Sequence, residues 1–274
     1  MTEPSMPTIG FIGAGNMAEA IARGLLRTAT YQAGDICATD PDAGRQRLFA
    51  DELGIGCGGD CGKAAGADIV ILAVKPFVMA DALAQIKGAV KAEALLISIA
   101  AGISTKFIEE GLGGAAKGAR VVRVMPNTPM LVGKGVSALC RGSLASEHDV
   151  IAAERIFAAG GKTVRVTEDL MDTVTAVSGS GPAYVFYLTE CLAAAGAAAG
   201  LTALQAEQLA RQTIIGAAAL LEQSKDTPAE LRRKVTTPKG TTQAAIETME
   251  AGDFGGMMKR AVEAAKRRSK ELGK

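Results

Sequence analysis

Two glycines near the start of the chain have the spacing of a turn that binds a dinucleotide. Gly13, Gly15 and Ala18 form the pattern Gly-x-Gly-x-x-Ala directly after the short apolar run 8–12. In such a motif the first glycine makes a tight turn, the second lets the backbone approach a pyrophosphate, and the small third residue keeps the next helix close to its strand. The pyrophosphate then lies at the positive end of that helix. The contacts predicted here are Gly13, Ala14, Gly15, Asn16 and Met17.

An acidic residue follows at the distance expected for ribose recognition. Asp40 stands 22 residues after Ala18, at the end of a second apolar run. A carboxylate at this position usually accepts hydrogen bonds from the adenosine ribose hydroxyls. The alternative is a local role, in which Asp40 caps the helix that follows. We interpret Asp40 as a ribose ligand.

Two other polar segments end apolar runs. Lys75 and Pro76 follow the run 68–74, and Asn127 lies in a loop that Pro126 and Pro129 hold rigid. The carboxyl ends of parallel strands face the ligand crevice of a sheet. A lysine after a strand is otherwise a solvated charge. The cofactor contacts predicted from these segments are Ala73, Val74, Lys75, Pro76 and Asn127.

Two short loops in the second half of the chain precede expected helices. The first, at 178–183, is rich in glycine and serine, and the second, at 235–242, combines hydroxyls with a glycine. Free backbone N–H groups at a helix start suit an anion, and the second loop suits a carboxylate. The alternative for each loop is ordinary capping by serine or threonine.

Other catalytic arrangements are missing from the sequence. His148 is the only histidine and is expected in the exposed first turn of a helix. Cys57 and Cys61 are four residues apart, too wide for a Cys-x-x-Cys pair, and have no histidine nearby, so no metal site is predicted. With so few acid and base groups, we expect a cofactor to supply the chemistry.

Composition narrows the class of protein. The chain has 274 residues, 48% hydrophobic and 22% charged, with a net charge of +1. This balance is typical of a globular protein and gives no field for binding nucleic acid or a membrane surface. The apolar segment 182–200 carries Glu190 at its centre and is mostly alanine and glycine, so we expect a packed helix and no membrane span. Five scattered cysteines and no signal-like segment predict a cytoplasmic protein.

The order of apolar runs predicts an α/β half followed by an all-helical half. Nearly continuous apolar strands that alternate with helices are typical of a parallel sheet covered on both faces. Strands are expected at 8–12, 35–38, 68–74, 94–99, 120–125, 135–139 and 163–166, and later helices at 182–199, 203–223, from 228, at 241–250 and at 254–272. We predict a dinucleotide-binding Rossmann domain at 1–166 and a helical domain at 167–274.

Taken together, these motifs resemble the Δ1-pyrroline-5-carboxylate reductase family over nearly the whole chain. The matching segments are 11–17, 73–76, 127–129, 178–184 and 238–242, and the last two are far more specific than a Rossmann fingerprint. The resemblance implies reduction of pyrroline-5-carboxylate to L-proline with NADPH or NADH, the last step of proline biosynthesis. It also implies a helical substrate-binding and dimerisation domain that builds a homodimer, often assembled further into decamers.

The resemblance also implies roles for individual residues. The substrate carboxylate should contact the backbone N–H groups of Gly240, Thr241 and Thr242, and Thr242 is the candidate for the group that faces the ring nitrogen. Ser178 and Gly179 should lie near the nicotinamide. The residues implied to bind substrate are Val235, Thr237, Gly240, Thr241, Thr242, Ser178 and Gly179. Lys239 departs from the family, which usually has glycine at this position. If the position needs a positive φ, the lysine is strained. If it does not, the lysine ammonium lies beside the site of the substrate carboxylate.

Two other functions remain open at this point. A 3-hydroxyacid or 6-phosphogluconate-type dehydrogenase also joins a Rossmann half to a helical half, but it needs a lysine on its first long helix, and 182–200 has none. A dinucleotide-sensing protein without activity would have no use for the polar segment 236–242. Turnover of NADPH with pyrroline-5-carboxylate distinguishes the three.

Overall fold

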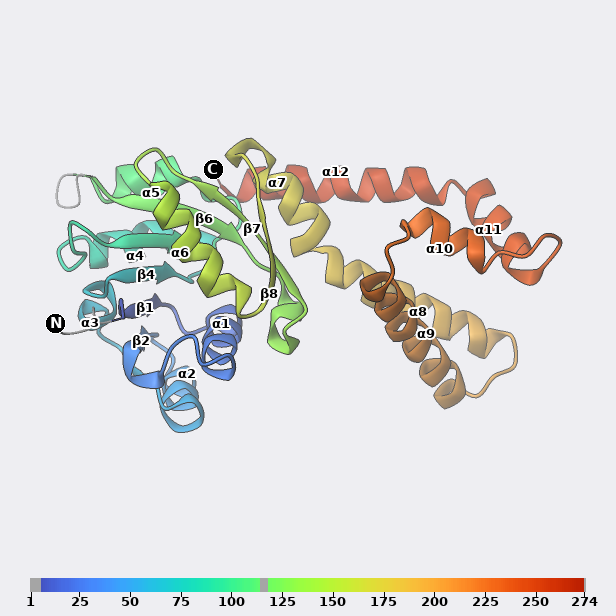
Figure 1. Ribbon diagram of the computed structural model, residues 1–274, viewed down its shortest axis with the longest axis horizontal. Helices are drawn as coiled ribbons and strands as arrows, with labels where there is room; N and C mark the ends of the chain where they lie inside the picture. Colours follow the sequence, from blue (N-terminus) through green and yellow to red (C-terminus); the bar gives the residue numbers. More distant parts are fainter. Residues whose placement is uncertain (1–5, 114–117, 274) are drawn as a thin grey trace. The chain divides into compact units, whose positions relative to one another are not determined.

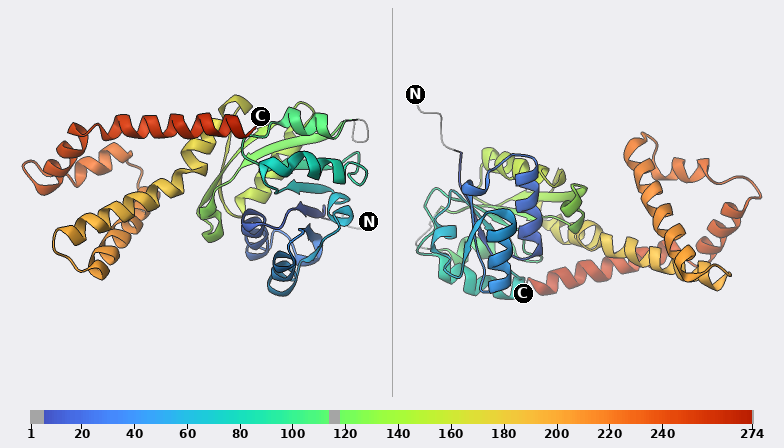
Figure 2. Two further views of the ribbon diagram at one scale, coloured as in Figure 1. Left: turned by 180° about the vertical axis from the view of Figure 1, so that it is seen from behind. Right: turned by 90° about the horizontal axis from the view of Figure 1, so that it is seen from below.

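In the computed structural model of the chain, which describes residues 6–113 and 118–273, the polypeptide forms two compact units (Figures 1 and 2). The sheet unit extends to Ser180 and includes the segment from Ala265 onward, and the helical unit is Gly181–Ala264. The sheet unit contains β1 (Ile9–Ile12), α1 (Asn16–Arg27), β2 (Ile36–Thr39), α2 (Ala43–Arg47), β3 (Gly56–Gly58), α3 (Gly62–Ala65), β4 (Ile69–Leu72), α4 (Met79–Ile86), β5 (Leu95–Ser98), α5 (Thr105–Gly111), β6 (Arg120–Met125), β7 (Gly135–Arg141), α6 (Glu147–Ala158), β8 (Gly161–Arg165) and α7 (Met171–Val174). The helical unit contains α8 (Gly181–Ala198), α9 (Ala203–Gln223), α10 (Pro228–Lys234), α11 (Thr241–Ala251) and the first part of α12 (Phe254–Leu272).

One eight-stranded sheet organises the first unit, in the order β3-β2-β1-β4-β5-β6-β7-β8. Alternate residues of its strands enter two separate cores. On β4, Ile69 and Ile71 pack with side chains of α1 and α6, whereas Val70 and Leu72 pack with α3, α4 and α5. Both faces are therefore covered by helices, as the apolar strands predict, and the α/β Rossmann class is confirmed.

The sheet differs from the prediction at both edges. Strand β3 was not predicted, and it pairs with β2 at one edge. Strand β7 runs antiparallel to β6, whereas an all-parallel extension was expected. The connection 126–134 is too short for a crossover between parallel strands, and it can join only antiparallel neighbours.

The helical unit follows the predicted order of helices. Thr202 accepts a hydrogen bond from the Gln205 N–H and Gln205 from the Thr202 N–H, the capping box expected at the start of α9. No strand is found between Glu168 and Gly273, which the structure describes throughout. None of the helices in the described ranges has the length and hydropathy needed to cross a bilayer.

The compact units divide after Ser180, later in the chain than residue 166. Met171 is fully buried and packs with Ala138 and Cys140 of β7, which keeps the segment around α7 with the sheet. The part of α12 from Ala265 onward also belongs to the sheet unit. The division into domains at residue 166 remains a prediction.

Candidate functional site

A cavity of about 850 Å³ lies in the sheet unit at the carboxyl ends of β1, β2, β4 and β5. This is the edge at which open α/β sheets bind ligands. All predicted cofactor residues except Ala14 and Asn127 line it, namely Gly13, Gly15, Asn16, Met17, Asp40, Ala73, Val74, Lys75 and Pro76. The sequence therefore placed most of its predicted cofactor residues in one cavity, although the cofactor role of each residue remains a prediction.

The glycine turn has the geometry that a dinucleotide phosphate needs. Gly13 has φ +97°, and a Cβ built on it would lie 2.8 Å from the Ala73 carbonyl oxygen, so only glycine fits. A Cβ on Gly15 would meet no atom within 4 Å and would occupy the space beside the turn. Gly15 is the N-cap of α1 and supplies no side-chain cap, so the first N–H groups of this helix remain available to an anion. The residues present fit a pyrophosphate.

Asp40 lines the cavity, and its carboxylate accepts hydrogen bonds from two backbone N–H groups. Its Oδ2 accepts a hydrogen bond from the Ala14 N–H at 2.8 Å, and its Oδ1 accepts one from the Asp42 N–H at 2.9 Å. Asp42, and not Asp40, is the N-cap of α2. The carboxylate of Asp40 is thus fixed beside the glycine turn, and Ala14 contributes by holding it there.

Arg45 is the basic residue nearest in sequence that could approach a nucleotide bound at Asp40, but it is held elsewhere. Its Nη2 lies 2.8 Å from Glu19 Oε2, and its Nε donates to the Ala14 carbonyl at 2.6 Å. Burial would raise the pKa of Glu19, but hydrogen bonds from Arg23 and Arg45 outweigh it and hold that pKa below its ordinary value. Glu19 is therefore ionised and keeps the Arg45 guanidinium on α1.

Sequence reasoning missed part of the cavity wall. Ile99, Ala100 and Ala101, which follow β5, line the cavity, and so do Asp81 and Gln85 of α4. The strand-end rule that identified Lys75 could also have found the three residues after β5. The two α4 side chains carry no sequence signal of their own.

Asn127 is buried and joins two of the predicted motifs. Its Oδ1 accepts a hydrogen bond from the Val136 N–H at 2.9 Å, and its Nδ2 donates to the Ser178 carbonyl at 3.1 Å. Pro182 has no N–H for the carbonyl four residues before it, which is that of Ser178, so the Asn127 amide replaces the missing helical donor. Asn127 does not line the cavity; in the structure it positions the segment that bears Ser178.

Ser178 and Gly179 lie in a helical turn, whereas a loop was expected. The segment Thr175–Gly179 is one turn of π-helix that continues α7, and the Ser178 hydroxyl donates to the Val174 carbonyl at 3.1 Å. A Cβ on Gly179 would lie 2.7 Å from Met125 Cε. The segment thus packs against the end of β6, and the interpretation of Ser178 and Gly179 as part of a loop was wrong.

The second predicted loop is part of the helical unit and lies at the start of α11. Gly240 is the N-cap of this helix and offers no side-chain cap, and its own N–H donates to the Thr237 carbonyl at 3.0 Å. Thr241 and Thr242 are the first two residues of the helix, and Val235 caps α10 with its side chain exposed. The N–H groups of Thr241 and Thr242 therefore remain available to an anion, whereas the Gly240 N–H, also predicted to bind one, already donates to the Thr237 carbonyl.

Lys239 has φ +61°, the left-handed conformation that favours glycine. A side chain in this region costs about 1–2 kcal/mol. The Gln243 side chain accepts a hydrogen bond from the Lys239 N–H at 2.7 Å and so supports the turn. The positive φ is the first of the two outcomes considered from the sequence, the one in which Lys239 is strained.

The single histidine and the potential metal ligands form no further candidate site in the described residues. His148 is exposed in the first turn of α6. No group of three or more potential metal ligands occurs in residues 6–113 and 118–273.

Comparison with known proteins covers both halves of the chain. Residues 168–272 match the family model for pyrroline-5-carboxylate reductase dimerisation, and residues 8–102 match the model for NADP oxidoreductase, coenzyme F420-dependent. The chain is 42% identical to pyrroline-5-carboxylate reductase from Pseudomonas aeruginosa, over 98% of this chain and 97% of the relative.

Solved structures agree with these matches. A pyrroline-5-carboxylate reductase from Coxiella burnetii is similar with a TM-score of 0.90 and 37% identity, covering 98% of this chain and 100% of that one. The Plasmodium falciparum pyrroline carboxylate reductase with NADP bound has a TM-score of 0.86 and 30% identity, with 98% of each chain covered.

Proposed function

The chain belongs to the pyrroline-5-carboxylate reductase family, and from that membership we propose how its residues share the reaction. Its activity is the reduction of 1-pyrroline-5-carboxylate to L-proline, the last step of proline biosynthesis, with NADPH or NADH. The ring C=N bond accepts a hydride at carbon, and the nitrogen ends as an amine. When bound, the dihydronicotinamide supplies that hydride. The observation that carries the assignment is the match of the dimerisation model to 168–272 together with a nucleotide cavity in the sheet unit.

The sheet unit would hold the nucleotide. The first N–H groups of α1 would bind the pyrophosphate, and Asp40 would accept hydrogen bonds from the ribose hydroxyls. Gly13 and Gly15 leave the space for the phosphates. The residues proposed to support the remainder of the cofactor are Ala14, Asn16, Met17, Ala73, Val74, Lys75, Pro76 and Asn127, the last by holding Ser178 in place.

The start of α11 would hold the substrate. The N–H groups of Thr241 and Thr242 and the Thr237 hydroxyl would bind the carboxylate, with Gly240 and Val235 beside them, because the Gly240 N–H already donates to the Thr237 carbonyl. A protonated iminium accepts hydride far more readily than a neutral imine, so the site needs a donor near the ring nitrogen more than a strong base. We assign that donor to the Thr242 hydroxyl, and Ser178 and Gly179 to the wall beside the nicotinamide. Besides these hydrogen bonds, the chain would orient the nicotinamide ring and the pyrroline ring relative to each other.

The direct test is turnover of NADPH and NADH with 1-pyrroline-5-carboxylate. We expect substrate-dependent oxidation of the nucleotide and formation of proline. A 3-hydroxyacid and 6-phosphogluconate, each assayed with NADP+ and NAD+ as the hydride acceptor, serve as controls, and neither should be turned over, because α8 carries no lysine. Activity on either control without activity on pyrroline-5-carboxylate would contradict the assignment.

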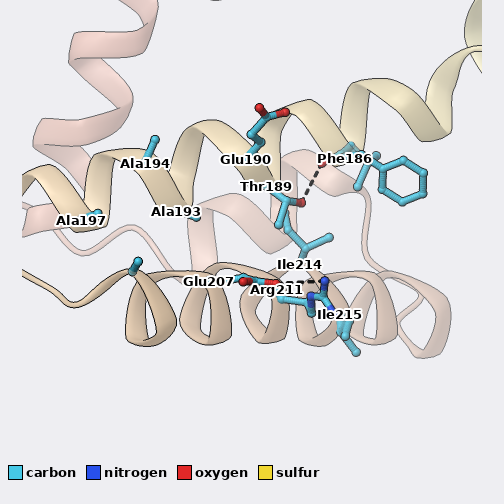
Figure 3. Close-up of a pocket in the computed structure, with 12 residues that line it drawn as sticks. Phe186, Thr189, Glu190, Ala193, Ala194, Ala197, Glu207, Arg211, Ile214 and Ile215 are labelled. Atoms are coloured by element: carbon cyan, nitrogen blue, oxygen red, sulfur yellow. Dashed lines mark hydrogen bonds and ion pairs between the residues drawn. The ribbon is translucent and has the colours of Figure 1, made fainter.

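The surface of the helical unit indicates how the homo-oligomer of this family is built. Helix α8 has no buried residue, and the only buried apolar residues of the unit are Ala206 and Ala210. Val185, Phe186 and Ile215 line a groove of about 760 Å³ between α8 and α9 (Figure 3). We propose that a second copy of the chain covers this apolar surface in a homodimer. The resemblance implies that such dimers can assemble further into decamers.

We propose the cytoplasm as the location of the protein. The cysteines of the described residues are free, as is usual for proteins of that compartment.

Sedimentation at micromolar protein concentration is therefore expected to show no monomer. Burial of each large apolar side chain contributes about 1.5–3 kcal/mol, so many of them together hold the copies firmly. Phe186→Asp places a charge in the groove and should release monomer, whereas Phe77→Asp, at the most exposed phenylalanine of the sheet unit, should leave the assembly intact. A folded and active monomer of the unmodified chain would refute the dimer.

A further inference from the structure

Backbone atoms of the last turn of α12 and of Gly273 approach backbone atoms of the loop that follows β5. Gly102 has φ +78°, and a Cβ built on it would lie 2.7 Å from the Ser269 carbonyl oxygen and 2.9 Å from the Gly273 nitrogen. A Cβ on Gly273 would lie 2.0 Å from the Gly102 carbonyl oxygen. No side chain heavier than hydrogen fits at either position, so the two segments are in close contact.

A buried polar network fixes the same turn from a second side. Ser269 is 3% exposed, and its hydroxyl donates to Asp172 Oδ1 at 2.7 Å. The guanidinium of Arg123, whose side chain is 5% exposed, lies 3.9 Å from that carboxylate oxygen and 3.4 Å from Glu168. The Arg123 guanidinium is buried and the two carboxylates are partly exposed, so loss of either carboxylate would leave a buried charge with one partner fewer, which is costly.

The network also reaches the loop after β5 at its other end. Glu168 accepts hydrogen bonds from both the N–H and the hydroxyl of Thr105, each at 2.7 Å. The segment 102–105 is thus held at Gly102 by the helix terminus and at Thr105 by Glu168. Ile99, Ala100 and Ala101, immediately before it, line the cofactor cavity.

We propose that the C-terminal turn Ser269–Gly273 positions the Ala100–Ala101 wall of the cofactor cavity. Ser269 and Gly273 are positioning residues in this proposal, since they act through Gly102 and do not line the cavity. The proposal rests on the proposed function only in taking this cavity as the nucleotide site.

Gly273→Ala in the full-length protein tests this proposal. The added methyl must displace the Gly102 carbonyl, so we expect the Kd and KM for NADH and NADPH to rise about fivefold, the scale of coupling through packed neighbours, with the KM for pyrroline-5-carboxylate changed less than about twofold. Calorimetric titration gives the Kd directly and does not depend on turnover. Gly102→Ala, which adds the methyl from the other side of the contact, should give the same shift.

Gly255→Ala is the matched control on the same helix. A Cβ there would meet no atom within 4 Å, so nucleotide binding should stay as in the unmodified protein. A fall in melting temperature of Gly273→Ala with unchanged Kd would overturn the proposal and leave the turn a purely stabilising contact. If the unmodified protein does not turn over pyrroline-5-carboxylate, the proposed function is contradicted. This inference is not, because the comparison of Kd values tests it separately.

Discussion

Thr242→Ala should lower kcat about 10–100-fold, with a smaller effect on nucleotide affinity. Thr242 is the second residue of α11, and Gly240, the N-cap, supplies no side-chain hydrogen bond there. A hydrogen bond to the ring nitrogen becomes stronger as the nitrogen changes from imine to amine, so its loss raises the barrier more than it weakens binding. Steady-state kinetics with saturating nucleotide measure the effect.

Two neighbouring variants show whether the hydroxyl is responsible. Thr242→Ser retains the hydroxyl and should recover most of kcat. Thr241→Ala removes the adjacent hydroxyl but keeps the backbone N–H proposed for the carboxylate, so it should change kcat little. If Thr242→Ala has full kcat, the proton donor is a water molecule or another residue.

Gly240→Val should affect the other kinetic constant. A Cβ at Gly240 would lie 2.3 Å from the Thr237 hydroxyl oxygen, so the new side chain crowds the place proposed for the carboxylate. We expect a higher KM for pyrroline-5-carboxylate at nearly unchanged kcat. This opposite pattern separates carboxylate binding from proton donation within the same short segment.

The unmodified enzyme should use NADH well and NADPH less efficiently. The Asp40 carboxylate is fixed by the Ala14 and Asp42 N–H groups, and Arg45 is held by Glu19. Lys75 follows β4, and β1 lies between β4 and β2. Lys75 is therefore about 10 Å across the sheet from the end of β2, which Asp40 follows. A carboxylate close to the 2′-phosphate is repulsive by roughly 1–4 kcal/mol, depending on how much water the site holds.

Asp40→Ser removes that charge and should shift the ratio of kcat/KM values toward NADPH by about tenfold or more, which is about 1.4 kcal/mol. Asp42→Ser is the matched control, because Asp42 caps α2 and does not line the cavity; serine can still cap the helix, so the ratio should not move. If the unmodified enzyme prefers NADPH more than about tenfold, Asp40 is not the ribose ligand.

Local patterns predicted the parts of this molecule whose geometry is local. The glycine turn, the capping box at Thr202 and the helix starts at Pro228 and Thr241 depend on residues within a few positions of one another. The strand-end rule then placed most of the cofactor residues in one cavity, because the strands are parallel where it was applied.

The errors arose where distant residues decide the local structure. The pattern Ser178-Gly179-Ser180-Gly181 has the composition of a loop, yet it is helical because the Asn127 amide supplies the donor that Pro182 lacks. Strand β3 contains two glycines, which are rare in strands, and forms through its pairing with β2. The packing of Gly273 on Gly102 leaves no mark in either local sequence.

That contact also constrains how the protein folds during synthesis. The ribosome releases the strands of the sheet unit first, and domains usually fold as they emerge. Here the loop after β5 must wait for the turn Ser269–Gly273, with the entire helical unit synthesised in between. Contacts of such long sequence separation form late. The nascent sheet can assemble early, but its nucleotide cavity should reach its final form only after Ser269–Gly273 has emerged from the ribosome.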